Sequence, residues 1–218
     1  MAEDKTSTRS LKSANFVWLC TLVTFDVVVL AALIFPGAIE LMSGNRIEIA
    51  RGFSSALLPI VPLLLTNTVP QLMKARLVFW RWHHPNPGSR AFSECVHGDD
   101  RVNVDKLREN IGEFPVSPKD QNSLWYSLYR KIQDDVGVRD AHKAFLLYRD
   151  MTSLSLMLLI LTALVMTLWG FKLSQIGKVA SVFLIQYGFT MVSARVAGNR
   201  LVCTVLSIYS MQKVPVPN

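Results

Sequence analysis

The sequence predicts an all-α membrane protein in which four transmembrane helices form two hairpins around an α-helical cytoplasmic insert. Three observations lead to this fold class. First, 50% of the 218 residues are hydrophobic, and the mean hydropathy is +0.30. Second, the apolar residues come in runs of about 18 residues or more, the length that a helix needs to cross a bilayer. Third, a polar stretch at residues 71–150 separates two pairs of these runs.

Charge and cysteine content narrow the class further. The net charge is +7, but basic and acidic residues nearly cancel within the insert, and the excess lies in the N-terminal tail and near the ends of the spans. This distribution fits a lipid bilayer as the partner, and no direct nucleic-acid contact is expected. The cysteines Cys20, Cys95 and Cys203 are odd in number and far apart, so we expect no disulfide framework.

The first hairpin is predicted at residues 16–36 and 52–70, after a polar cytoplasmic tail at residues 1–15. The run at 16–36 is longer than the apolar core of a signal peptide, and no Ala-x-Ala pattern follows it. We therefore expect an uncleaved transmembrane helix. Pro59 and Pro62 predict a kink in the second span.

The second helix is expected to run on past Pro70 to about residue 82 and to meet the membrane surface there. Its lysines and arginines would contact lipid headgroups, and its tryptophans suit the interfacial belt. The residues concerned are Lys74, Arg76, Trp80, Arg81 and Trp82.

The insert at residues 71–150 is predicted as a cytoplasmic helical domain. Residues 83–90 contain two prolines and a glycine, which rule out a regular α-helix there. A short helix is expected at 103–112. Ser117 followed by Pro118 indicates the start of another helix, which carries an apolar stripe at helical spacing.

The second hairpin begins with a long helix that starts in water and enters the membrane near Arg149 and Asp150. Its transmembrane part is predicted at residues 152–171. A tight turn leads to the fourth span at 179–198, and residues 199–218 are predicted as a cytoplasmic C-terminal helix and tail. Because lysine and arginine are concentrated in the tail and the insert rather than in the two short outer loops, both termini and the insert are expected on the cytoplasmic side.

Two intramembrane polar groups are candidate functional residues. Asp26 lies near the middle of the first span, where a carboxylate is costly and is usually paired, protonated or facing water. It is either a pore-lining or proton-coupled acid, or a neutral acid bonded to Gln186, Tyr187 or Asn67. Arg195 is expected at a pore mouth, at lipid headgroups, or paired with an acid of the insert.

The fourth span also carries a set of small residues, which allows close approach of another helix within the chain or between subunits. The set consists of Ser193, Ala194, Ala197 and Gly198.

Basic residues around the proline–glycine turn form the candidate ligand- or headgroup-binding site, because guanidinium groups suit phosphate oxygens. Its members are Arg81, His83, His84, Arg90 and Arg101. The histidines together with Cys95 and His97 lack the spacing that zinc sites show, so neither a metal nor a cofactor is expected. No phosphate-loop, dinucleotide-binding or hydrolase motif occurs, and no catalytic residue is assigned.

The order of two spans, a helical insert and two spans resembles the small four-span membrane subunits of bacterial antiphage defence systems, the membrane subunit of the Kiwa system among them. The resemblance is carried by this layout and by insert residues 84–92, 121–126 and 149–150. It implies a homo-oligomeric effector or sensor of the bacterial inner membrane that disturbs the membrane on infection. Its cytoplasmic domain would receive a protein partner or a small nucleotide.

Two other hypotheses stay open on the sequence. One is a small channel or transporter that uses Asp26, and the other is a membrane-bound enzyme that acts on lipid or nucleotide through His83, His84 and Arg90.

Overall fold

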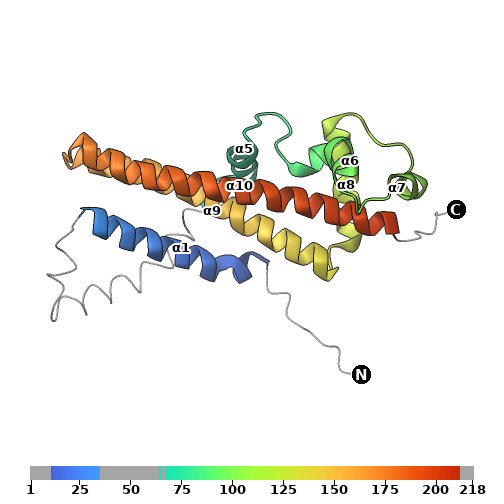
Figure 1. The fold of residues 1–218 in the computed structure, drawn as a ribbon, viewed down its shortest axis with the longest axis horizontal. Coiled ribbons are helices and arrows are strands. Elements are labelled where there is room, and N and C mark those ends of the chain that lie inside the picture. The colour runs from blue at the N-terminus through green and yellow to red at the C-terminus, as the bar shows by residue number, and fades with distance from the viewer. Residues whose placement is uncertain (1–10, 35–63, 65–66, 212–218) are drawn as a thin grey trace, which may run out of the picture. The chain divides into compact units, whose positions relative to one another are not determined.

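The computed structural model describes residues 11–34, 64 and 67–211, and these residues form helices and loops without a β-strand (Figure 1). The all-α prediction is confirmed for this part of the chain. In chain order the helices are α1 (Leu11–Ile34), α5 (Gln71–Phe79), the 3-10 helix η1 (Pro87–Arg90), the π-helix η2 (Ala91–Cys95), α6 (Val96–Gly98), α7 (Val104–Ile111), α8 (Pro118–Ile132), α9 (Val136–Leu168) and α10 (Leu173–Met211).

The chain divides into two compact units, and the long helices α9 and α10 contribute to both. We call Met1–Val69 with Ser153–Tyr187 the apolar unit, and Pro70–Thr152 with Gly188–Asn218 the polar unit.

Three of the described helices are long and apolar enough to cross a membrane, as expected of a membrane protein. They are Asn15–Ile34, Val136–Leu168 and Leu173–Met211. The predicted second span at 52–70 lies outside the described residues, apart from residue 64 and residues 67–70. The four-span layout in two hairpins therefore stays a prediction.

The apolar unit exposes large hydrophobic side chains along its helices, as expected of a surface that lipid tails cover. Phe25, Ile160 and Ile185 are all more than half exposed. Inside the unit, Phe183 of α10 packs in a buried cluster with Met166 of α9.

The two helices predicted for the second hairpin are each unbroken, and their arrangement as a membrane hairpin stays a prediction. α9 begins at Val136 and continues to Leu168, slightly short of the predicted end at residue 171. The helix stops there because Gly170 adopts a left-handed φ of 73° and the Phe171 amide donates to the Met166 carbonyl, a common way to end a helix. α10 then runs from Leu173 to Met211, so the predicted fourth span and C-terminal helix are one element.

A hydrophobic core joins the helices of the polar unit. Leu107 of α7, Leu128 of α8, Val138 of α9 and Leu206 of α10 all belong to one buried cluster. Burial of a side chain of this size is worth about 1.5–3 kcal/mol, so the core is the main stabilising feature of the polar unit.

Caps and a glycine determine where α7 and α8 begin and where α7 ends. The Asn103 side chain accepts a hydrogen bond from the Lys106 amide at 3.0 Å, and α7 ends at Gly112, which has a φ of 79°. The Ser117 hydroxyl accepts from the Asp120 amide at 3.3 Å and caps α8.

The helix expected to run past Pro70 to about residue 82 has different bounds. α5 begins at Gln71 and ends at Phe79, because Trp80 adopts a left-handed conformation with a φ of 52°. The chain after it contains η1 instead of a regular α-helix, as the two prolines and the glycine of 83–90 predict.

The glycine of this turn is required by close packing between η1 and α8. A Cβ atom on Gly88 would lie 2.6 Å from Cε3 of Trp125, and only a residue without a side chain fits there. Gly88 therefore allows the turn to lie directly on the indole ring.

The expectation of no disulfide framework needs correction, because Cys95 and Cys203 form a disulfide. Their Cα atoms are 5.6 Å apart although 108 residues separate them in sequence. The bond links η2 to α10 within the polar unit, and Cys20 of α1 is a free cysteine. Wide spacing in sequence does not prevent a disulfide once helix packing brings two cysteines together.

Candidate functional site

The apolar unit contains a hydrogen-bonded cluster at Asp26. Asp26 of α1 is 2% exposed, and its Oδ2 atom accepts a hydrogen bond from Nε2 of Gln186 at 3.2 Å. The same Gln186 amide donates to Oγ of Ser155 on α9 at 3.1 Å. This bond to Gln186 is the one expected for an acid that holds helices together, and it ties α1, α9 and α10 to one another.

We expect Asp26→Leu to lower the stability of the apolar unit by about 1 kcal/mol, the usual value of an interhelical hydrogen bond in a membrane. Asp26→Asn keeps an acceptor for Gln186 and should leave stability nearly unchanged. Thermal unfolding of the full chain in detergent would measure both variants. Equal stability losses would show that the charge, rather than the hydrogen bond, is what matters at this position.

Arg195 lies at the C-terminal end of α5. Its Nε atom donates to the Val78 carbonyl at 2.6 Å, and its guanidinium carbon lies 5.1 Å from the centre of the Trp80 ring. The carbonyls of the last helical turn have no partner within the helix and carry partial negative charge, which a cation stabilises. Arg195 thus binds a helix end rather than an acid of the insert.

Three of the four small residues predicted for close packing are buried against other helices of the same chain. Ala194 and Ala197 are buried, and a Cβ atom on Gly198 would lie 3.0 Å from both Phe79 and Phe145. Ser193 is half-buried and lines a separate cavity of about 360 Å³ together with Val192, Val196 and Arg200.

The predicted ligand- or headgroup-binding residues do not form a single site. Arg81 and Arg90 both approach Glu94, at 3.7 and 3.1 Å. Arg101 instead forms an ion pair with Asp99 at 2.7 Å, which lowers the pKa of Asp99. His83 and His84 are exposed. Among residues 11–34, 64 and 67–211, no group of His, Cys, Asp and Glu could hold a metal ion.

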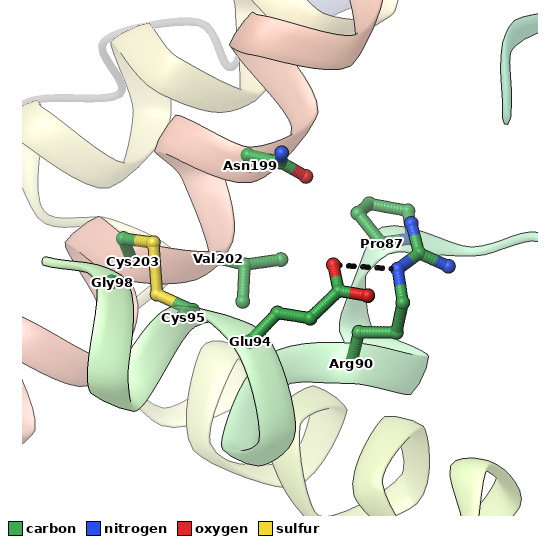
Figure 2. A pocket seen from close by; sticks show the side chains of 8 residues that line it. All are labelled: Pro87, Arg90, Glu94, Cys95, Gly98, Asn199, Val202 and Cys203. Atoms are coloured by element: carbon green, nitrogen blue, oxygen red, sulfur yellow. Dashed lines mark hydrogen bonds and ion pairs between the residues drawn. A yellow bond between two sulfur atoms is a disulfide. The ribbon is translucent and has the colours of Figure 1, made fainter.

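Arg90 is the most buried of these side chains. It lines a cavity of about 240 Å³ with Glu94, Asn199 and the Cys95–Cys203 disulfide (Figure 2). Burial, followed by the nearby charge of Arg81, lowers the pKa of Arg90. Because Glu94 pairs with Arg90 inside this cavity, the arginine's charge is largely compensated there.

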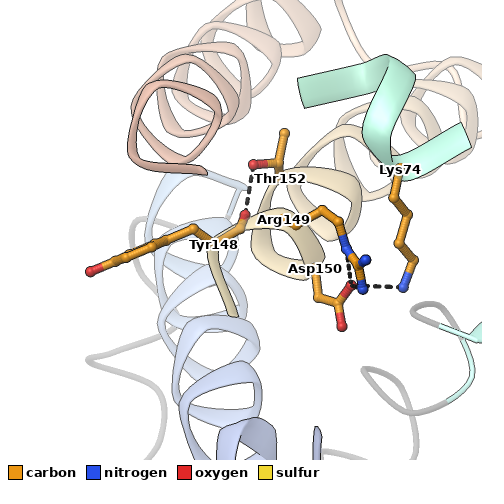
Figure 3. Close-up of polar contacts among 5 residues, drawn as sticks. All are labelled: Lys74, Tyr148, Arg149, Asp150 and Thr152. Carbon is orange, nitrogen blue, oxygen red and sulfur yellow. Dashed lines mark hydrogen bonds and ion pairs between the residues drawn. The ribbon is translucent and has the colours of Figure 1, made fainter. Parts of the chain in front are cut away.

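A buried ion cluster on α5 and α9 was not recognised as a site from the sequence. Nζ of Lys74 lies 2.9 Å from Oδ1 of Asp150, and the Arg149 guanidinium reaches the same oxygen at 3.1 Å (Figure 3). Lys74 is only 1% exposed, so the prediction that it meets lipid headgroups is wrong. The signal available in the sequence was the Arg149–Asp150 pair directly before an apolar run.

A cavity of about 240 Å³ lies beside this cluster in the polar unit, and Arg149 is part of its wall. Its other lining residues are Asn86, Pro87, Asn122, Trp125, Tyr126, Tyr129, His142, Phe145, Leu146 and Leu201. We call it the aromatic cavity. The sequence predicted the aromatic residues of α8 only as a packing stripe, because periodicity cannot show that part of a stripe borders an opening.

His142 of the aromatic cavity is partly buried against Tyr129. Its Nδ1 atom is hydrogen-bonded to the Tyr129 hydroxyl at 2.8 Å. Burial, followed by the charge of Arg149, lowers the pKa of His142 below its ordinary value of 6.5.

We expect the polar unit to lose stability as the pH falls below about 6.5, because the unfolded chain then binds a proton on His142 more readily than the folded chain does. The contribution is complete above the unfolded pKa and is lost as the pH falls through the lowered native pKa. Unfolding measured at about pH 7.5 and about pH 5.5 should show a smaller difference for His142→Gln than for the wild type. The exposed His83→Gln variant serves as the control and should keep the wild-type difference.

Comparison with known proteins gives no assignment, since no protein-family model, curated protein or solved structure matches this chain.

Proposed function

We propose that the protein is a homo-oligomeric sensor or effector of the bacterial inner membrane, in which the polar unit receives a signal and α9 passes it to the apolar unit. One observation supports this most directly. The single helix α9 carries His142 and Arg149 at the aromatic cavity, Asp150 in the ion cluster, and then the apolar stretch of a candidate span.

The ion cluster provides a physical route for the signal. Asp150 is shared between Arg149 of its own helix and Lys74 of α5. A ligand or protein partner that attracts Arg149 would change how Asp150 holds Lys74. Pairing between α5 and α9 would then depend on the state of the cavity, at the point where α9 becomes apolar.

Self-association is supported by the cavity around Ser193. Val192 and Val196 are both more than half exposed there, and small neighbours such as Ser193 allow a helix to approach closely. A second copy of this chain would cover these apolar side chains. Cross-linking in native membranes would measure the subunit number.

The proposal is tested by interrupting α9. Cells that express the chain are challenged with a panel of phages while a voltage-sensitive dye reports membrane potential. We expect depolarisation in infected cells that express the wild type and none before infection. Four glycines inserted after Asp150 should abolish the response, because they break the helix between cavity and span.

The matched control carries the same four glycines after Gly112, in the exposed loop between α7 and α8. It should respond like the wild type. Persistent polarisation in every infected wild-type culture would refute the proposal, as would a normal response from the chain interrupted after Asp150.

A further inference from the structure

The aromatic cavity has a flat π-rich wall. Trp125 and Tyr129 stack with ring centroids 5.6 Å apart and an interplanar angle of 18°. Tyr126 lies 6.0 Å from Tyr129 and is 53% exposed, so its ring is available at the edge of the opening. Gly88 and Tyr129 lie against the indole ring of Trp125, so the exposed ring of Tyr126 is the one on which a planar heteroaromatic ring can stack.

Trp125, one of the residues of this wall, also carries a buried donor with an unmet hydrogen-bonding requirement, and this donor itself has almost no accessible surface. The Trp125 side chain is 8% exposed, and its Nε1–H has no hydrogen-bond partner within the part of the chain that the structure describes. Buried donors are almost always paired, so this one requires an explanation. The amides of Asn86 and Asn122 add donors and acceptors at the edge of the opening.

The charge around the cavity selects for an anion. Arg149 is the single permanently charged residue among those that line it, and none of them is an aspartate or a glutamate. Nε and Nη2 of Arg149 bind Asp150, while Nη1 takes part in neither bond. The Nη1 side of the guanidinium, which is not part of this ion pair, suits a phosphate oxygen.

We infer that the aromatic cavity binds a mononucleotide, with the base against Tyr126 at the opening and the phosphate toward Arg149. The inference rests on the proposed function, because it names the signal that the polar unit receives. A volume of about 240 Å³ lies below the usual range of about 300–1,000 Å³ for ligand pockets, so the cavity takes no more than one nucleotide and leaves part of it outside. The phosphate would compete with Asp150 for Arg149 and so alter the pairing of Asp150 with Lys74.

Calorimetric titration of the full chain in detergent tests the inference. The probes are AMP, GMP, adenosine and inorganic phosphate. We expect at least one of the two nucleotides to bind saturably, and more tightly than either adenosine or phosphate. Tyr126→Ala removes a stacking ring at an exposed position and should weaken nucleotide binding about tenfold.

Asn122→Asp tests the phosphate position more specifically, because it keeps the side-chain shape and places a negative charge in the cavity wall. It should weaken nucleotide binding by about tenfold or more through repulsion of the phosphate. Asn199→Asp is the matched control, because it makes the same change at an exposed residue of the Arg90 cavity. It should bind nucleotide within about twofold of the wild type. Circular dichroism confirms that each variant is folded.

Absence of nucleotide binding up to about 1 mM would overturn the inference. Equal affinity of phosphate and nucleotide would also overturn it, as would unchanged binding by both Tyr126→Ala and Asn122→Asp. These outcomes are independent of the depolarisation assay. Depolarisation without nucleotide binding would refute this inference alone, and nucleotide binding without depolarisation would refute the sensor function alone.

Discussion

Asp150→Leu is expected to lower the free energy of unfolding of the polar unit by about 3–5 kcal/mol, the usual cost of removing one partner from a buried ion pair. The carboxylate contacts two cations at once, and Lys74 and Arg149 are only 1% and 8% exposed. Leucine fills a similar volume but leaves both cations without this anion. Denaturant unfolding of the full chain in detergent, followed by tryptophan fluorescence, would measure the change.

Lys74→Met should cost less than Asp150→Leu, because Asp150 then keeps its bond to Arg149. The control is Asp140→Leu, since Asp140 lies on the same helix but is exposed. It should change stability by no more than about 0.5 kcal/mol. If Asp140→Leu and Asp150→Leu had equal effects, the buried cluster would not be a stabilising element of the polar unit.

Reduction of the Cys95–Cys203 disulfide is expected to lower the stability of the polar unit by about 2–4 kcal/mol. The bond closes a loop across 108 positions of sequence, and long loops restrict the unfolded chain the most. Unfolding with and without dithiothreitol would measure the loss. Cys203→Ser should be insensitive to the reductant, whereas Cys20→Ser, which removes the free cysteine, should respond like the wild type.

Thiol counting on native protein from intact cells complements this experiment. Disulfides persist in oxidising compartments and are rare in the cytosol. One free thiol per chain would show that the bond forms in the cell, and three would show that it does not. The result also bears on the predicted cytoplasmic position of the insert, which rests on lysine and arginine placement alone.

Much of the helical framework was predictable because it depends on local signals. The Ser117 cap and the glycine at the end of α7 act within one helical turn, and both are confirmed. The length of α9 followed from a continuous helical pattern with no glycine or proline between Val138 and Leu168. Such signals need no knowledge of what lies next to the helix.

The candidate site was less predictable because it depends on contacts between distant residues. Lys74 was expected at headgroups, but its partner Asp150 lies 76 residues further along the chain. Arg195 was expected at a pore mouth, at headgroups or near an acid, but a carbonyl 117 residues away accepts its hydrogen bond. In both cases the residue type indicated a charge, but it did not indicate which group lies next to that charge in the fold. Asp26 was the exception, since Gln186 was among the few polar groups available within the spans.

The length of α10 has a mechanical consequence. Its 39 residues make a rod of about 58 Å at 1.5 Å per residue, while the hydrocarbon core of a bilayer is about 30 Å thick. Nearly half of its length therefore exceeds what one span requires, and the same unbroken backbone continues from the apolar unit into the polar unit.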